Sequence, residues 1–158
     1  MNGTISKEFI YCLASKFRKA MDEAYRNEEF KGIIGLRDFP NGSCGITSCL
    51  LGEYLMEHGI PTKYINRTYY YGDTSFDSQA HTWLELTPNL IVDITGDQFK
   101  SNSTLKNYSN SVYVGAYNGF YNLFESTPNS EYKLIKGQIL SPSEKIVYNE
   151  IKKYLNNK

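Results

Sequence analysis

The sequence predicts a single α+β domain in which helices pack against an antiparallel sheet. Some segments place apolar residues at helical spacing, and others alternate apolar and polar residues. The helical segments are residues 5–29, 44–58 and 141–155, and the strand-like segments are residues 62–71, 80–87 and 90–95. Pro88-Asn89 is a tight turn between the last two strands, which should therefore pair as an antiparallel hairpin. The chain is long enough for one core, and nothing marks a domain boundary within residues 1–158.

Composition and charge exclude several classes of function. The formal net charge is zero, so nothing favours binding to nucleic acid or to an anionic membrane. No apolar run approaches the length of a membrane span, and the N-terminus lacks the features of a signal peptide. The three cysteines, an odd number, suit a reducing compartment better than a disulfide framework. We therefore expect a cytoplasmic protein, with a toxin or effector delivered without a cleaved signal as the alternative.

The helical segments have recognisable ends and faces. In residues 5–29 the apolar stripe contains Cys12, which we expect to be a small core residue, whereas Arg18 lies off that stripe. Residues 44–58 are broadly apolar and should be buried. We expect Ser43 to cap this helix, Gly59 to end it, and His58 in its last turn to be a capping or surface residue.

The remaining segments are less regular. Residues 30–43 and 100–111 should be loops, and residues 112–114 a further strand. Residues 117–133 are aromatic and irregular, and we expect them to cover one side of a site. Ser141-Pro142-Ser143-Glu144 is a capping box that opens the final helix. The 14 tyrosines suit a sheet surface, although a substrate-contacting aromatic surface is the alternative.

Cys44 is the candidate nucleophile. It stands where a glycine-containing loop becomes an apolar helix, and Gly42 and Gly45 allow another molecule to approach the backbone closely. The unpaired N–H groups and the dipole at a helix start favour the thiolate, which is the reactive form of cysteine. The alternative is a buried structural cysteine, because free cysteines are among the most buried residues.

His81 and Asp93 are the candidate base and its orienting acid. His81 opens one strand of the predicted hairpin, and Asp93 lies in the apolar partner strand, where an unpaired carboxylate is costly. Cysteine, histidine and aspartate at element edges suit nucleophilic catalysis with an oriented base. Asp97 is the competing carboxylate and should be more exposed, and Gln98 is an alternative local hydrogen-bonding partner.

The rest of the candidate site concerns the oxyanion and the substrate. The backbone N–H of Cys44 is one candidate oxyanion donor, and Asn41 is a candidate for the second. Gly42 and Trp83 complete the candidate substrate-binding residues, although Trp83 is most simply a core residue. A zinc site from Cys44, Cys49 and His81 matches no standard ligand spacing, so we expect no metal and no cofactor.

Three motifs resemble the transglutaminase-like branch of the papain-like cysteine enzymes. They are Gly42-Ser43-Cys44, His81-Thr82-Trp83-Leu84-Glu85 and Val92-Asp93-Ile94-Thr95. Phe39 to Cys44 and Asp93 to Phe99 also resemble small uncharacterised bacterial proteins with Phe-Pro-x-Gly-x-Cys and Asp-Ile-Thr-x-Asp-Gln-Phe motifs. The resemblance covers roughly residues 39–99. It implies a nucleophile-bearing helix on an antiparallel sheet, with Cys44 as nucleophile, His81 as base and Asp93 as orienting acid.

The function expected from this resemblance is a cysteine-dependent amide hydrolase or acyltransferase. Such a fold supports proteolysis, deamidation and transglutaminase-type transfer through a thioester, so the substrate can be a protein, a peptide or a small amide. The alternative is a catalytically silent protein-binding module whose contact surface is the aromatic region 113–124. The sequence does not determine the oligomeric state.

Overall fold

A computed structural model describes residues 3–86, 89–106 and 110–156, and within these ranges the fold is α+β, as expected. The helices are α1 (Lys7–Arg26), α2 (Cys44–Glu57) and α3 (Pro142–Leu155), with short 3₁₀ turns η1 (Gly96–Phe99) and η3 (Tyr121–Leu123). The strands are β1 (Lys63–Tyr70), β2 (Ser78–Leu86), β3 (Leu90–Asp93), β4 (Tyr113–Gly115) and β5 (Glu125–Lys133). Among the helices of these ranges, none is both long and apolar enough to cross a membrane.

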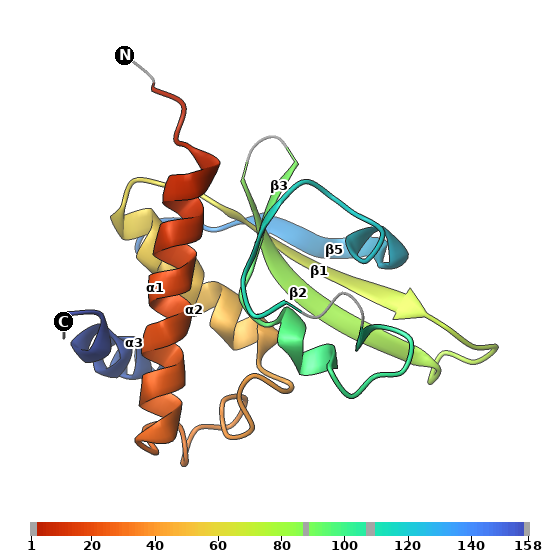
Figure 1. Ribbon diagram of the computed structural model, residues 1–158, viewed down its shortest axis with the longest axis horizontal. Helices are drawn as coiled ribbons and strands as arrows, with labels where there is room; N and C mark the ends of the chain where they lie inside the picture. The colour runs from red at the N-terminus through yellow and green to blue at the C-terminus, as the bar shows by residue number, and fades with distance from the viewer. Residues whose placement is uncertain (1–2, 87–88, 107–109, 157–158) are drawn as a thin grey trace.

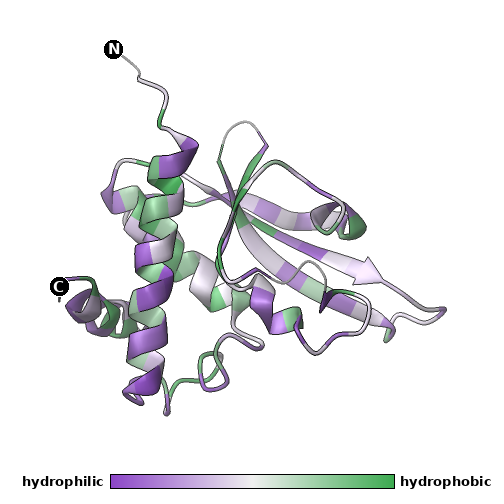
Figure 2. Ribbon diagram, viewed as in Figure 1, coloured by the Kyte–Doolittle hydropathy of each residue, from purple (hydrophilic) through white to green (hydrophobic). Residues whose placement is uncertain are grey.

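Helix α1 is amphipathic, but its buried stripe is displaced from the expected one. Ser6 caps the helix by accepting the N–H of Phe9 at 3.1 Å. The stripe is centred on Leu13 and Phe17, which leaves Cys12 exposed and makes the expectation of a core Cys12 wrong. Arg18 is buried rather than on the solvent face, because its guanidinium reaches acceptors outside the helix. Figure 2 shows the mixture of hydrophilic and hydrophobic residues along α1.

Helix α2 begins at Cys44 and is apolar over most of its surface. Ser43 precedes it but does not cap it with its side chain, contrary to expectation, because the hydroxyl donates to the Pro40 carbonyl at 2.8 Å. Gly59, with φ of +75°, follows the last turn, and His58 is exposed there, both as expected. The expected capping box opens α3.

The five strands form one antiparallel sheet in the order β4-β3-β2-β1-β5. The predicted hairpin is present, with Leu84 opposite Val92, although Pro88 of the predicted Pro88-Asn89 turn and the last residue of the predicted strand 80–87 lie outside the described ranges. Strand β3 pairs only with residues 84–86 of β2, so it does not cover the edge of β2 at residues 78–82. Strand β5 is a correction, since residues 117–133 had no predicted strand. Its Pro128 and a register shift opposite β1 obscure any alternation.

The sheet separates two cores of different character. The face toward α1, α2 and α3 carries the larger core, whose central residues include Phe17, Leu50 and Leu84. The opposite face is covered by residues around η1 and η3, and its smaller core is mostly aromatic. In Figure 1 the helices gather at one end of the sheet, and the far ends of β1 and β2 extend beyond them. Part of the helix-side face of the sheet therefore lies beyond the helix layer.

Candidate functional site

The structure brings Cys44, His81 and Asp93 together. The Nε2 atom of His81 lies 2.7 Å from Oδ2 of Asp93, and both side chains are buried. Continuing the hairpin register would put Asp93 opposite Trp83, so Asp93 and His81 are diagonal neighbours on one face of the sheet. Cys44 hydrogen-bonds the His81 ring from the first residue of α2. In Figure 1 this end of α2 approaches β2 and η1.

Both oxygens of Asp93 are hydrogen-bonded. Oδ2 accepts from the Tyr121 hydroxyl at 2.8 Å as well as from His81. Oδ1 accepts from the Thr95 N–H at 2.9 Å and lies 3.3 Å from its hydroxyl. Burial raises the pKa of Asp93, but the charge and hydrogen bond of His81, with the bonds from Thr95 and Tyr121, hold it below its usual range. The carboxylate is therefore ionised and fixed in orientation.

His81 is enclosed by aromatic rings. The edge-to-face contact with Phe99 has a centroid separation of 4.9 Å, and Phe120 and Phe124 lie at 6.0 and 5.9 Å. Burial alone would lower the pKa of His81, but the Asp93 carboxylate and the Cys44 contact raise it to about 9. Residues 120–124 thus cover one side of the site, as expected for part of the segment 117–133, whereas residues 125–133 form the edge strand β5.

Cys44 is half-buried, and two residues of β2 stabilise its thiolate. Burial raises its pKa, but the hydrogen bond and charge of His81 outweigh this, with further hydrogen bonds from the backbone and hydroxyl of Thr82. The pKa of Cys44 is consequently lowered. The Thr82 N–H can reach the sulfur because that stretch of β2 is not paired with β3. Geometry and charge together favour a thiolate–imidazolium pair.

The second cysteine of α2 behaves in the opposite way. Cys49 is half-buried, and burial with the nearby Glu144 raises its pKa to about 11. It is therefore protonated and unreactive at neutral pH. The two thiols differ because only Cys44 has a cationic partner.

Gln98 makes a third contact with the imidazole. Its Nε2 lies 3.1 Å from Nδ1 of His81 and 3.1 Å from the carbonyl oxygen of Thr95. Two acceptors on either side of one nitrogen identify it as the amide N–H₂ group. When His81 is neutral with its proton on Nε2, Gln98 can donate to Nδ1, the ring nitrogen that Asp93 does not engage. The sequence analysis treated Gln98 only as an alternative local partner.

An ion pair behind Gln98 ties η1 to helix α1. The Arg18 guanidinium makes two 2.7 Å bonds to the two carboxylate oxygens of Asp97, and another 2.7 Å bond to the Ile94 carbonyl. Asp97 is 8% exposed and Asp93 is 2% exposed, so Asp97 is the more exposed carboxylate, as expected, although both are buried. It pairs with Arg18 instead of His81. The pair holds the segment that carries Asp93 and Gln98.

Three other candidate residues do not join this cluster. Asn41 and Gly42 are exposed in the loop before α2, and the backbone N–H of Asn41 bonds to the Asp38 carbonyl at 2.8 Å. Gly42 has φ of +66°, which explains the glycine by backbone conformation alone. Trp83 is fully buried among Tyr121 and other rings, so the structure contradicts the assignment to substrate binding and agrees with a core role.

Thr82 and Tyr121 are site residues that sequence reasoning missed. Thr82 follows His81 directly, and its hydroxyl and N–H can face the thiol because β3 does not pair with that part of β2. Tyr121 was within the aromatic segment, but no spacing rule links it to Asp93, 28 residues earlier. Both contacts depend on the tertiary fold.

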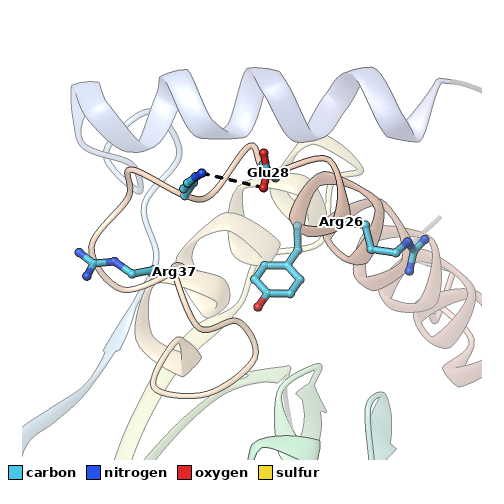
Figure 3. Close-up of a pocket in the computed structure, with 5 residues that line it drawn as sticks. Arg26, Glu28 and Arg37 are labelled. Atoms are coloured by element: carbon cyan, nitrogen blue, oxygen red, sulfur yellow. Dashed lines mark ion pairs between the residues drawn. The ribbon is translucent and has the colours of Figure 1, made fainter.

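Other features of the surface lack a comparable cluster. Among the described residues, no group of three or more histidine, cysteine or acidic side chains is arranged to hold a metal ion. A pocket of about 350 Å³ is lined by Tyr25, Arg26, Glu28, Lys31 and Arg37. Figure 3 shows Arg26 and Arg37 pointing away from each other, so their charges do not converge on one ligand.

Comparison with known proteins leaves the residues themselves as the basis for assigning a function. No protein-family model, no curated protein and no solved structure matches the chain.

Proposed function

We propose that the protein is a cysteine-dependent amide hydrolase or acyltransferase that uses Cys44, His81 and Asp93. The observation that carries the proposal is the continuous line of contacts from the Cys44 thiol through the His81 ring to the Asp93 carboxylate. Such a line is what an activated nucleophile requires. The arrangement of α2 against an antiparallel sheet supports a papain-like, transglutaminase-like fold as part of the same proposal.

The chemistry follows from which ring nitrogen is free. Asp93 engages Nε2 of His81, so Nδ1 takes the thiol proton, and the Gln98 amide 3.1 Å away no longer donates to it once that proton has moved. The Cys44 sulfur attacks the carbonyl carbon of the amide, forming a C–S bond while the carbonyl electron pair moves to oxygen. Collapse of this intermediate breaks the C–N bond, and His81 gives its proton to the leaving nitrogen. Water or an amine then attacks the thioester and frees the Cys44 thiol.

The alternative of a silent binding module loses the most aromatic part of its proposed surface, residues 120–124, while Tyr113 and Tyr117 are half-buried. Phe120, Tyr121 and Phe124 are at most 3% exposed, because they form the core around His81 and Asp93. Side chains buried in this way cannot supply the contact area for a partner. No other observation favours the module.

Alkylation with iodoacetamide at pH 7 tests the proposal. Cys44 should react much faster than Cys49, because a thiol with a pKa of about 11 is ionised in only about one molecule in ten thousand at that pH. His81→Asn should slow alkylation of Cys44 by about tenfold or more. The proposal fails if Cys44 in the unmodified protein reacts no faster than Cys49 and no faster than a free thiol. This comparison within the unmodified protein needs no variant to fold.

Intact-mass analysis with candidate peptides then identifies the reaction. Cleavage of a peptide indicates a protease, and a gain of about one mass unit on a glutamine peptide indicates deamidation. Gain of an added amine indicates acyl transfer. Cys44→Ala is the control in each case, and product formation by that variant would contradict the role of Cys44.

A further inference from the structure

One side chain near Cys44 has no role in the line of contacts just described. Tyr64 lies on β1, and its ring stacks on Tyr132 of β5 with a centroid separation of 4.8 Å and an interplanar angle of 20°. Its hydroxyl lies over the first turn of α2, because a Cβ placed on Gly45 would meet that oxygen at 3.2 Å. The residue after the nucleophile is therefore a glycine with a phenol hydroxyl packed against it.

The Tyr64 hydroxyl belongs to a polar group that includes the nucleophile. Thr82, which hydrogen-bonds Cys44, also hydrogen-bonds Tyr64, as does the Asn66 side chain. The register explains the grouping, since Asn66 pairs with Thr82 and Tyr64 with Leu84 on the helix-side face of the sheet. Tyr64 and Asn66 are half-buried, so this group is open to a small molecule.

Tyr64 carries a proton that it can donate. Burial raises the pKa of Tyr64, so it is a phenol at neutral pH, while the hydrogen bonds with Thr82 and Asn66 act in the opposite direction. The O–H group over the first turn of α2 is therefore a hydrogen-bond donor for an acceptor that arrives with a substrate.

Backbone donors are available at the same place. The first N–H of α2 that bonds within the helix is that of Thr47, to the Ser43 carbonyl at 2.9 Å. The N–H groups of Cys44, Gly45 and Ile46 come before it and belong to the unpaired start of the helix. A carbonyl attacked by Cys44 would thus lie between backbone N–H groups and the Tyr64 hydroxyl.

We propose that Tyr64 is a catalytic residue that donates a hydrogen bond to the oxyanion formed when Cys44 attacks an acyl carbonyl. This inference rests on the proposed function and supplies the second oxyanion donor for which the sequence suggested Asn41. The face leading to the site bears only uncharged residues in the pairs Asn66–Thr82, Thr68–Ala80 and Tyr70–Ser78. That lining suits a neutral acyl group, such as an uncharged amide or ester.

Two reactions of the same thiol separate this role from others. Acylation by p-nitrophenyl acetate forms a C–S bond, passes through an oxyanion and expels p-nitrophenolate, leaving an acetyl thioester. Alkylation by iodoacetamide also forms a C–S bond but displaces iodide without an oxyanion. Tyr64→Phe should therefore slow acylation by about tenfold to a hundredfold and leave alkylation within about twofold of the unmodified protein.

Matched variants complete the experiment. Tyr132→Phe removes the hydroxyl of the stacked ring and should leave both rates unchanged, whereas Gly45→Ala should push the Tyr64 hydroxyl aside and slow acylation selectively. The inference about Tyr64 is overturned if Tyr64→Phe acylates at the normal rate, or if both of its rates fall in parallel. If the unmodified protein is not acylated at Cys44 at all, the proposed function and the inference fail together.

Discussion

The two faces of the sheet pack against cores of different residue composition, and each face contributes different parts of the candidate site. On the helix side the core is largely aliphatic, and the chain places Cys44 at the start of α2. On the opposite side aromatic rings surround a buried charge pair, His81 and Asp93. Charge is costly inside a core, so the aromatic face must supply hydrogen-bond partners for the Asp93 carboxylate that it buries.

The two faces meet where β3 leaves β2 uncovered. Strand β3 pairs with residues 84–86 only, so the edge of β2 at Thr82 is open to the N-terminal end of α2. Cys44 can therefore reach a histidine whose side chain belongs to the other face. The short strand β3 is thus as necessary to the site as the three side chains themselves.

The largest effect that separates the two faces is expected from Asp93→Ala. This change leaves His81, the Tyr121 hydroxyl and the Thr95 N–H without their buried acceptor. We expect a loss of about 3–5 kcal/mol in the free energy of unfolding, measured by urea denaturation, and loss of the preferential alkylation of Cys44.

The matched control is Leu50→Ala, which removes a fully buried side chain from the helix-side core. It should cost about 2–5 kcal/mol, a similar amount, while Cys44 in the folded fraction keeps its reactivity. Equal loss of reactivity in both variants would contradict the division between the faces.

The next effect concerns the ion pair that joins α1 to η1. Arg18→Met removes the guanidinium and leaves the Asp97 carboxylate buried without its partner. Breaking such a pair should destabilise the fold by about 3 kcal/mol. The double variant Arg18→Met with Asp97→Leu should recover part of that loss in urea denaturation. No recovery would mean that the Arg18 contacts with the Ile94 and Ser111 carbonyls matter more than the charge pair.

The sequence predicted those parts of the site that depend on local spacing. A strand–turn–strand pattern was enough to pair β2 with β3 and to put His81 near Asp93, because hairpin register follows from the turn. The start of α2 at Cys44 could also be predicted from local sequence, because a glycine-containing loop precedes an apolar segment.

The parts that escaped prediction depend on contacts between distant segments. Arg18 interrupts the expected polar face of α1 only because Asp97, 79 residues later, reaches it. Tyr121 and Tyr64 were two tyrosines among 14, and nothing local distinguishes the one that bonds Asp93 or the one that lies over Gly45. Side chains of one type differ in role through tertiary packing alone.

A smaller effect should appear in the pH dependence of stability. The folded state raises the pKa of His81 to about 9 from 6.5, so this stabilisation is complete below pH 6.5 and is lost as the pH rises toward 9. The lowered pKa of Cys44 acts in the opposite sense, because a depressed thiol pKa contributes stability that is lost as the pH falls. The two contributions should therefore offset each other in the unmodified protein.

Cys44→Ala removes the contribution of the thiol and leaves that of His81. Above about pH 6.5 the free energy of unfolding of this variant should fall with pH, by up to about 1.4 kcal/mol per unit, and the fall should end at a lower pH than 9 because Cys44 no longer helps to raise the pKa of His81. Urea denaturation at several pH values measures the slope for both proteins. The same slope with and without Cys44 would contradict the coupling between the thiol and the imidazole.

The smallest effect should come from Gln98→Leu. This change tests whether the Gln98 amide, on the aromatic side, affects the proton equilibrium between His81 and the Cys44 thiol. The Gln98 amide donates to Nδ1, and this bond exists only while Nδ1 carries no proton. Its loss should disfavour the neutral imidazole and lower the pKa of the Cys44 thiol by about half a unit to one unit. The pH profile of iodoacetamide alkylation measures that shift, with Gln79→Leu, on the far part of β2, as the control. An upward shift would instead mean that the Gln98 amide turns from the ring to the thiolate once the proton has moved, which would make Gln98 a stabiliser of the reactive state.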